Sequence, residues 1–245
     1  MRNIIVKDYE KMSKKAADMV ASFIQIDPEL VIALPTGHTP LKMYKELISL
    51  YKQGEVDFSN VRFINLDEYY PIKKSRSNSF YYYLENNFLS KINVKAENIH
   101  LINGAADSYK KECKRYQNKI KKWGKIDLVI LGLGENGHIG FNEPDDFLKL
   151  GPHLNKLSIL TRNNNSEYFA SFDEVPLKAI TIGIDNILNA NKILLLANGK
   201  HKQKAVSMLF SEKISTYYPV SFLRLHKNVI SILDKKAAGQ LRKGE

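Results

Sequence analysis

A glycine-rich segment in the middle of the chain combines a histidine and a carboxylate that could transfer protons. From Gly132 to Pro144 the sequence reads Gly-Leu-Gly-Glu-Asn-Gly-His-Ile-Gly-Phe-Asn-Glu-Pro, and its first nine residues include four glycines. Glycines allow tight turns and a close approach of the backbone to a ligand. An imidazole near a carboxylate is a common proton-transfer unit. We therefore predict an acid–base role for His138 and Glu143, with Asn136 adding a hydrogen bond to the ring.

Two adjacent acids, Asp67 and Glu68, follow a second apolar segment that ends at Leu66. Neighbouring side chains on an extended chain point to opposite sides, so at most one of these acids faces a given cleft. A carboxylate at a strand end that is partly removed from water acquires a raised pKa, which suits a general base. One of the two acids is therefore a candidate base.

A turn at residues 34–40, Leu-Pro-Thr-Gly-His-Thr-Pro, has the form of an anion site. A strand is expected to end at Leu34, and a helix to start at Pro40 with Thr39 as its N-cap. Free backbone N–H groups and the positive end of the helix dipole would then point into the turn. This arrangement suits an anion such as phosphate.

Other familiar site patterns are missing from the sequence. No Gly-Lys-Ser/Thr follows a loop, and there is no Gly-x-Ser-x-Gly, so neither a P-loop nor a hydrolase nucleophile elbow is expected. Residues 132–137 have the Gly-x-Gly-x-x-Gly spacing of a dinucleotide site, but Asn142 and Pro144 keep the following segment irregular instead of helical. The histidines are scattered. We predict no metal and no cofactor.

The candidate residues lie among apolar strands that alternate with amphipathic helices. The sequence predicts strands over residues 31–35, 61–66, 126–133, 178–182, 193–197 and 229–233, and helices over residues 12–24, 40–50, 78–89, 109–123 and 201–210. Such alternation is typical of an α/β fold with a mainly parallel sheet covered by helices on both faces. Ligands bind these sheets beyond the carboxyl ends of the strands, which marks out the segments after Leu34, Leu66 and Leu133.

Length and composition fit one globular domain over residues 1–245, since 44% of the residues are hydrophobic and 26% are charged. The single cysteine, Cys113, excludes a disulfide framework and favours a cytoplasmic location. No apolar run approaches the ~18–20 residues of a membrane span, so no membrane partner is expected.

The formal net charge is +11, from 37 Lys and Arg against 26 Asp and Glu. Part of the excess lies between Lys110 and Lys125, where Glu112 is the single acid. A charge run of this kind is typical of a solvated helix face. We therefore predict no nucleic-acid partner.

The three segments resemble the motifs of the glucosamine-6-phosphate deaminases, also called glucosamine-6-phosphate isomerases. The similar motifs are Leu-Pro-Thr-Gly-x-Thr-Pro at residues 34–40, Asn-Leu-Asp-Glu-Tyr at residues 65–69, and Gly-Glu-Asn-Gly-His-Ile-Gly-Phe-Asn-Glu-Pro at residues 134–144. Their order and spacing also match. The resemblance implies a Rossmann-like fold without a nucleotide cofactor. It also implies conversion of glucosamine 6-phosphate and water to fructose 6-phosphate and ammonia.

The resemblance further implies roles for individual residues. Asp67 would be the base that moves a proton between C2 and C1 of the sugar, with Glu68 beside it in the substrate site. His138 would open the pyranose ring, helped by Asn136 and Glu143. Substrate phosphate would be bound by the turn and by the lysine of a Gly-x-x-Lys pattern, namely by Thr36, Gly37, His38, Thr39 and Lys202.

Three positions depart from the family pattern. Asn136 stands where some members have Asp, and His38 replaces a small residue of the phosphate turn. Glu167 stands where a phosphate-binding Arg is expected, and a carboxylate there would repel phosphate. We expect either that Arg162 substitutes for this arginine or that the substrate differs from the usual one. The segment over residues 157–172 resembles an active-site lid.

Alternative functions remain open from the sequence. Galactosamine 6-phosphate as substrate would yield tagatose 6-phosphate. The 6-phosphogluconolactonases share the fold. Their sequences at the Gly-His motif resemble Gly-His-Thr-Ala-Ser-Leu-Phe-Pro, and residues 137–144 of this chain do not match that motif. A sugar-phosphate-sensing regulator would need a DNA-binding module, for which the roughly 30 residues before Val31 are too few. A homo-oligomer is possible, since the family includes monomers and hexamers.

Overall fold

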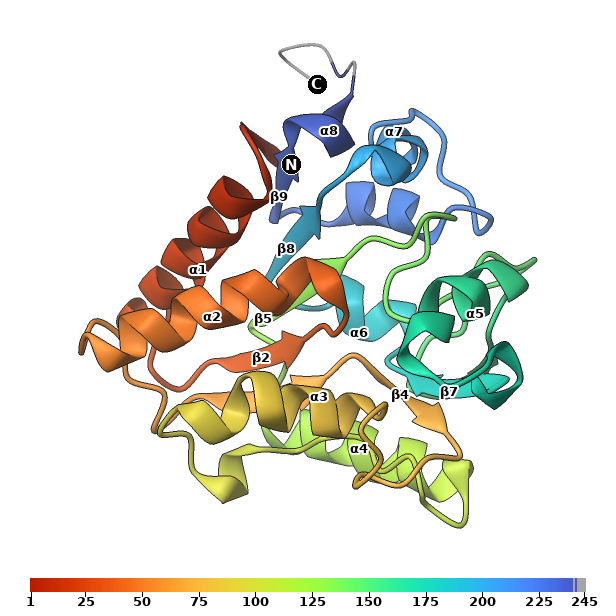
Figure 1. Cartoon of the computed structure of the whole chain (residues 1–245), viewed down its shortest axis with the longest axis horizontal. Helices are drawn as coiled ribbons and strands as arrows, with labels where there is room; N and C mark the ends of the chain where they lie inside the picture. The colour runs from red at the N-terminus through yellow and green to blue at the C-terminus, as the bar shows by residue number, and fades with distance from the viewer. Residues whose placement is uncertain (240, 242–245) are drawn as a thin grey trace.

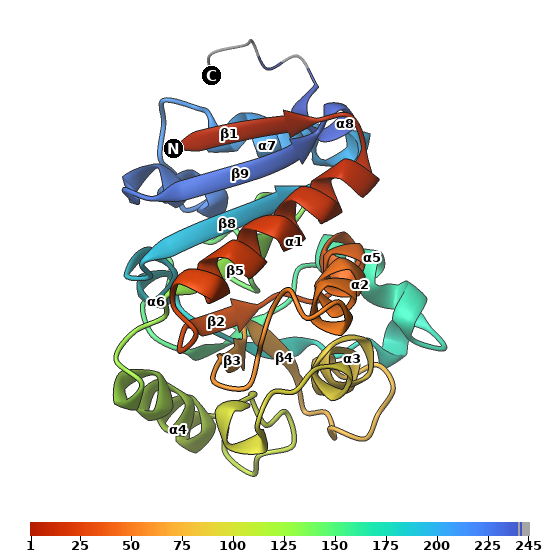
Figure 2. The same cartoon turned by 90° about the vertical axis from the view of Figure 1, so that its left-hand side faces the viewer.

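The computed structural model describes residues 1–239 and 241, and its centre is a six-stranded parallel sheet, sheet A. The strand order is β1-β9-β8-β5-β2-β3, which Figure 2 shows from top to bottom. The bounds are β1 Arg2–Val6, β2 Val31–Leu34, β3 Arg62–Asn65, β5 Leu128–Gly132, β8 Lys192–Ala197 and β9 Val229–Asp234. The predicted parallel sheet is confirmed.

Helices cover both faces of sheet A (Figure 1). Their bounds are α1 Tyr9–Ile26, α2 His38–Lys52, α3 Phe80–Asn87, α4 Tyr109–Lys122, α5 Ile159–Asn165, α6 Ile184–Leu188, α7 Gln203–Leu209 and α8 Lys235–Ala238. Short 3₁₀ helices are η1 Leu89–Lys91, η2 Ala96–Asn98, η3 Ser166–Tyr168, η4 Phe172–Glu174, η5 Lys200–Lys202 and η6 Pro219–Leu225.

A hydrophobic core lies on each face of sheet A, and successive side chains of a strand alternate between these two cores. Leu128 and Ile130 of β5 pack in the cluster that contains α1 and α2, whereas Val129 and Leu131 pack with α4, α6 and α7 on the other face. Successive side chains of a strand point to opposite faces. A strand covered on both faces must therefore be apolar at every position, and this is why β5 reads as a continuous hydrophobic run.

A second sheet, sheet B, was not expected from the sequence. It is antiparallel, with strand order β4-β7-β6 and bounds β4 Asp67–Tyr70, β6 His153–Lys156 and β7 Lys178–Thr181. The predicted strand over residues 61–66 ends at Asn65, and the chain then enters sheet B at Asp67. The segment over residues 178–182 is a strand, as predicted, but its assignment to the parallel sheet is wrong. Its apolar alternation fits either sheet, and only the partner strands decide between them.

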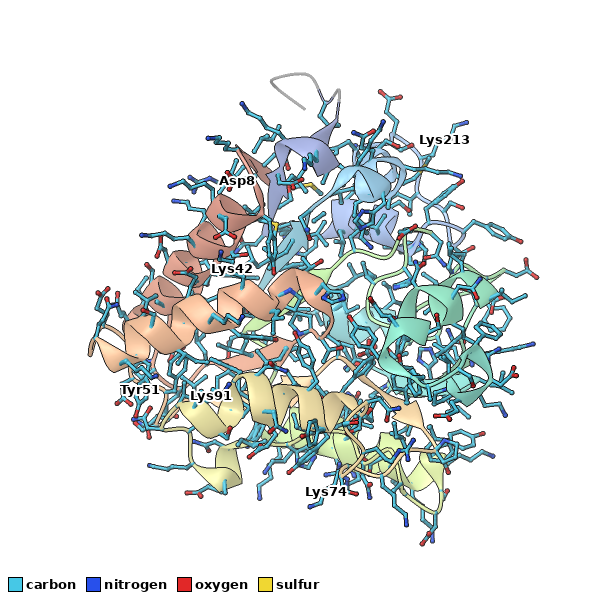
Figure 3. The ribbon with its side chains drawn as sticks, viewed as in Figure 1. Asp8, Lys42, Tyr51, Lys74, Lys91 and Lys213 are labelled. Atoms are coloured by element: carbon cyan, nitrogen blue, oxygen red, sulfur yellow. The ribbon has the colours of Figure 1, made fainter. Side chains whose placement is uncertain are left out.

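Side chains cap several helices, as their sequences suggest. Asp8, labelled in Figure 3, accepts the N–H of Lys11 at the start of α1 at 2.9 Å. Lysines such as Lys74, Lys91 and Lys213 point away from the ribbon in the same view. Among the described residues, no helix is both long and apolar enough to cross a membrane.

The start of α2 differs from the prediction. Thr39 does not cap this helix, because the helix begins at His38, two residues before the predicted start at Pro40, after Gly37 with φ +89° and without a side-chain cap. The positive φ is readily adopted by glycine and turns the chain sharply into the helix. The hydroxyl of Thr39 instead donates to the side-chain oxygen of Asn198, beyond β8, at 3.0 Å.

Candidate active site

One cavity of about 350 Å³ brings together the three segments that the sequence marked out. It lies beyond the carboxyl ends of β2, β5 and β8, and its lining includes residues 35–39, Asp67, residues 132–135 and His138. Strand β2 lies between β3, the next strand of sheet A along the chain, and β5, which pairs with the opposite edge of β2. Such a reversal of strand order opens a crevice at the sheet edge, where α/β proteins bind ligands.

His138 is held at this cavity by a polar cluster. Its Nδ1 lies 3.5 Å from Glu143 Oε2 and 3.4 Å from Thr161 Oγ1. A Cβ atom at Gly134 would lie 2.4 Å from the imidazole ring, so only glycine leaves room for this ring position. The histidine–carboxylate pair predicted from the sequence is therefore brought together in the structure.

Asn136 is placed differently from the prediction, because it does not bond the imidazole ring. Its amide donates to Glu143 Oε2 at 2.7 Å, and its side-chain oxygen accepts the backbone N–H of His138 at 3.1 Å. The tight turn at Gly137, with φ +88°, directs the Asn136 side chain to the backbone and to the carboxylate. Asn136 therefore orients the pair indirectly.

Glu143 is the ionised member of this cluster. Burial alone would raise its pKa, but hydrogen bonds from His138, Thr161 and Asn136 and the charge of His138 lower the pKa of Glu143 to about 2. The side chain is 5% exposed. A buried carboxylate that stays charged at neutral pH therefore lies 3.5 Å from His138 Nδ1.

We predict that Glu143→Gln destabilises the fold at pH 7 and that this loss shrinks in acid. A carboxylate with a depressed folded-state pKa contributes stability above its ordinary pKa of 4.5, and the contribution is lost as the pH falls toward 2. The expected loss at pH 7 is about 2–3 kcal/mol. Urea unfolding of both proteins at pH 7 and pH 3 measures it. If the unfolding free energies of the wild type and the variant differ by the same amount at both pH values, the prediction is wrong.

Asp67 and Glu68 face opposite sides, as the extended backbone requires. Asp67 lines the cavity. A Cβ atom at Gly140 would lie 3.5 Å from Asp67 Oδ2, so this carboxylate lies against the loop that carries His138. Burial, and after it the charge of Glu68, raises the pKa of Asp67 to about 8. Once ionised, a carboxylate with this pKa is a stronger base than an ordinary aspartate, which suits removal of a proton from carbon.

Glu68 does not line the cavity, so its predicted contact with substrate has no support in its placement. Its carboxylate accepts the backbone N–H groups of Tyr69, Phe80 and Tyr81 at 3.0, 2.9 and 2.7 Å. Burial raises the pKa of Glu68 to about 7, although these three hydrogen bonds act in the opposite direction. Glu68 thus ties the first turn of α3 to β4.

The turn at residues 36–39 and Lys202 form the cationic end of the cavity. The uncapped first turn of α2 begins there, and burial lowers the pKa of Lys202, opposed by the charge of Glu135. Two further lining residues, Asn198 and His201, were missed in the sequence. The strand-end rule would have found them if it had also been applied after β8.

Arg162 lies outside the cavity lining, so its placement argues against a phosphate contact. Its guanidinium donates to the carbonyls of Phe172 and Val175 and stacks on the Phe172 ring at 4.2 Å. Glu167 lines the cavity mouth, where its Oε1 lies 2.9 Å from His38 Nε2. His38 and Glu167, which both differ from the family pattern, therefore contact each other across the mouth of the cavity.

The fold and the cavity define an α/β protein with an acid–base site and an anion-type turn at one sheet edge. Residues 8–231 match the family model described as glucosamine-6-phosphate isomerases/6-phosphogluconolactonase. The chain therefore belongs to this family.

Individual relatives narrow the comparison. A glucosamine-6-phosphate deaminase of Clostridium botulinum (strain Loch Maree / Type A3) is 49% identical over 98% of this chain and 99% of the relative. A glucosamine-6-phosphate deaminase of Thermoanaerobacter sp. (strain X514) is 48% identical over 97% of this chain and 94% of its own. A solved monomeric glucosamine-6-phosphate deaminase superposes with a TM-score of 0.95 at 40% identity, covering 99% of this chain and 100% of the other.

A more distant structure shares only the fold. The 6-phosphogluconolactonase from Leishmania guyanensis superposes with a TM-score of 0.77 at 22% identity, covering 99% of each chain.

Proposed function

We propose that the protein converts glucosamine 6-phosphate and water to fructose 6-phosphate and ammonia. The observation that carries this proposal is the single cavity that joins Asp67 to the His138–Glu143 pair and to a cationic end. The near-full-length similarity to glucosamine-6-phosphate deaminases supports the same substrate.

Ring opening is the first step and uses the histidine–carboxylate pair. His138 donates a proton to the ring oxygen O5 as the C1–O5 bond breaks, and the C1 hydroxyl gives its proton to water, which leaves an aldehyde at C1. Glu143, ionised and within 3.5 Å of the imidazole, stabilises its protonated form. A positioned acid of this kind contributes about 10²–10⁴-fold to a rate.

Isomerisation and loss of ammonia follow. Asp67 removes the proton from C2, and the electron pair forms a C1–C2 double bond while O1 takes up a proton from water. Asp67 then returns the proton to C1, which leaves an imine at C2. Water adds to this imine, the C2–N bond breaks, and fructose 6-phosphate and ammonia are released. The raised pKa of Asp67, which follows from its burial, makes it a strong enough base for the C–H step.

The phosphate group occupies the cationic end in this proposal. The first turn of α2 offers backbone N–H groups and the positive end of the helix dipole. Lys202, which also lines the cavity, adds a positive charge. Glu167 Oε1 lies 2.9 Å from His38 Nε2, so the histidine ring engages this carboxylate at the cavity mouth.

Incubation with glucosamine 6-phosphate, with ammonia and fructose 6-phosphate as readouts, tests the proposal. We expect equal amounts of the two products. Galactosamine 6-phosphate and 6-phosphogluconolactone are run in parallel. Faster conversion of the galactosamine epimer would assign that substrate instead. Hydrolysis of the lactone without ammonia release from either amino sugar would assign a lactonase.

We predict that Lys202→Met raises KM for the sugar phosphate with little change in kcat. The lysine would bind the phosphate equally in the ground state and in the transition state, so its loss weakens binding and not chemistry. Removing a charge-assisted hydrogen bond of about 1.5–3 kcal/mol corresponds to a KM increase of roughly 10- to 100-fold. Initial rates over a range of substrate concentration measure this, with the exposed Lys213→Met as control. A fall in kcat at unchanged KM would remove Lys202 from the phosphate site.

One solved relative is described as a monomeric glucosamine-6-phosphate deaminase. We therefore propose that activity does not require assembly, although a homo-oligomer remains compatible with the fold. The lone Cys113 fits a cytoplasmic enzyme.

A further inference from the structure

Within the part of the chain that the structure describes, no side chain or backbone group aims the carboxylate of Asp67 through a hydrogen bond. Among the described residues, none donates a hydrogen bond that contributes to the pKa of this carboxylate, which is governed by burial and by the charge of Glu68. A general base must be held within hydrogen-bonding reach of the proton that it removes. The direction of the Asp67 side chain must therefore be set by its backbone and by packing.

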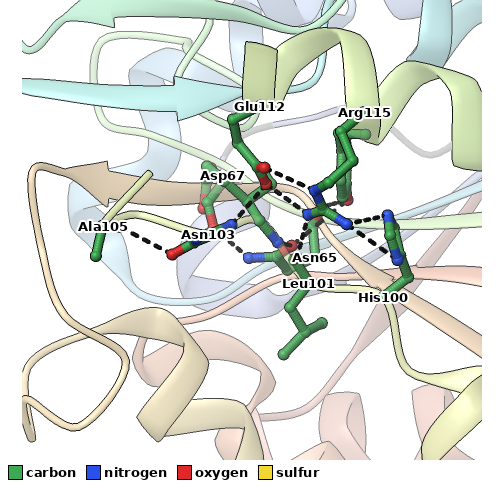
Figure 4. Close-up of polar contacts among 10 residues, drawn as sticks. Asn65, Asp67, His100, Leu101, Asn103, Ala105, Glu112 and Arg115 are labelled. Atoms are coloured by element: carbon green, nitrogen blue, oxygen red, sulfur yellow. Dashed lines mark hydrogen bonds and ion pairs between the residues drawn. The ribbon is translucent and has the colours of Figure 1, made fainter. Parts of the chain in front are cut away.

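Asn65 holds that backbone (Figure 4). Its side-chain amide donates to the carbonyl of Asp67 at 2.7 Å, and its side-chain oxygen accepts the N–H of Ile102 at 2.9 Å. The residue is fully buried, with 0% exposure. It is the last residue of β3, at the point where the chain leaves sheet A and enters sheet B, so the bond to Asp67 spans the break between the two sheets.

Helix α4 fixes the partners of Asn65 in turn. Tyr116 donates to the backbone carbonyl of Asn65. Glu112 accepts the N–H of Asn103 at 2.7 Å, and Arg115 donates to the carbonyl of Leu101 at 3.0 Å. Ile102, the donor to Asn65, lies between these two anchored residues. Figure 4 shows Glu112 and Arg115 reaching from the helix to this segment.

We infer that Asn65 is a positioning residue, which aims the Asp67 carboxylate at the substrate by holding the Asp67 carbonyl. This inference rests on the proposed function for the identity of the base. A buried amide is retained only where its hydrogen bonds are satisfied, and both ends of the Asn65 amide bond backbone groups. Leucine would fill the same volume, but it would leave the carbonyl of Asp67 and the N–H of Ile102 without these partners.

Asn65→Ala is the variant that tests the inference. We expect kcat to fall about 10- to 100-fold with KM within about threefold of the wild type, because a misplaced base slows proton transfer and leaves phosphate binding intact. The kinetic isotope effect on substrate deuterated at C2 should rise, because proton transfer becomes more fully rate-limiting. A loss of folded protein alone does not change an isotope effect.

Asn186→Ala is the matched control, since Asn186 is also a buried amide, bonded to Gln117 and to the N–H of Gly183, away from the cavity lining. We expect this variant to lose stability with an unchanged isotope effect. If Asn65→Ala does not fold, Asn65→Leu decides, because leucine keeps the volume but can neither donate to the Asp67 carbonyl nor accept from Ile102. An unchanged isotope effect in the folded Asn65 variant overturns the inference.

A crystal structure of the Asn65 variant separates this inference from the proposed function. We expect the Asp67 carboxylate to turn away from the loop that carries Gly140. If the wild type releases no ammonia from any of the amino sugars, the proposed function fails, and the crystal structure still tests the positioning role. An unchanged Asp67 side chain in the variant overturns that role whether or not the wild type is a deaminase.

Discussion

Asp67→Asn should abolish ammonia release and at the same time raise the thermal stability of the protein at neutral pH. The first effect follows from removing the base that moves the proton between C2 and C1. We expect a loss in kcat of at least about 10³-fold, within the usual contribution of a positioned general base. Substrate binding, measured by calorimetric titration, should remain close to that of the wild type, because the phosphate end is untouched.

The gain in stability has a separate physical cause. The folded-state pKa of Asp67 is raised from 3.8 to about 8, so burial of this side chain opposes ionisation. Below the ordinary pKa the group is protonated in both folded and unfolded chains and costs nothing. Between about 4 and 8 the unfolded chain ionises and the folded chain does not, so wild-type stability falls as the pH rises. Asparagine carries no such penalty.

The expected gain for Asp67→Asn at pH 7.5 is of the order of 1–3 kcal/mol, because the cavity admits some water to the side chain. This corresponds to an increase of several degrees in the melting temperature. At pH 4 the two proteins should melt at nearly the same temperature, which provides an internal control. A lower melting temperature of the variant at pH 7.5, or loss of binding with loss of turnover, would contradict the assigned role.

His138→Gln should slow the reaction of the cyclic substrate about 10²–10⁴-fold, because ring opening loses its acid. The 5-deoxy analogue of glucosamine 6-phosphate has no ring oxygen O5 and cannot form the pyranose. We expect the variant to convert this analogue at nearly the wild-type rate. Ammonia release from both compounds is the measurement.

Asp67→Asn provides the matched comparison for His138→Gln. It should fail with the cyclic substrate and with the 5-deoxy analogue, because both require proton transfer from C2 to C1. Equal impairment of His138→Gln with the two compounds would show that the histidine acts after ring opening, and its role would have to be reassigned.

The local sequence was sufficient to predict the parallel sheet and the residues at its edge. The apolar run of β5 indicates a strand buried on both faces, and the glycines around His138 indicate a tight loop. A Cβ at Gly134 would collide with the imidazole, which explains why glycine is needed there. These features depend on neighbours within a few residues, so periodicity and spacing reveal them.

Other placements depended on contacts between distant segments. The sequence of β7 does not show that it pairs with β4 and β6 instead of joining sheet A. The hydrogen-bond partners of Glu68 and Arg162 could not be predicted for the same reason. Glu68 bonds the first turn of α3, and Arg162 bonds carbonyls of the segment around η4. Neither partner is recognisable from the local sequence.

By itself, the sequence determined strands β2, β3, β5, β8 and β9 of the parallel sheet, but not β1, and the acids, the imidazole and the anion-type turn that stand at the strand ends. Tertiary structure alone decided that these groups share one cavity, that His38 meets Glu167, and that Asn65 holds the backbone of Asp67. The physical reason is the separation along the chain between interacting residues. Strand periodicity and glycine turns depend on residues that are close in sequence. Hydrogen bonds between residues such as His38 and Glu167 form only after the packed elements have brought them together.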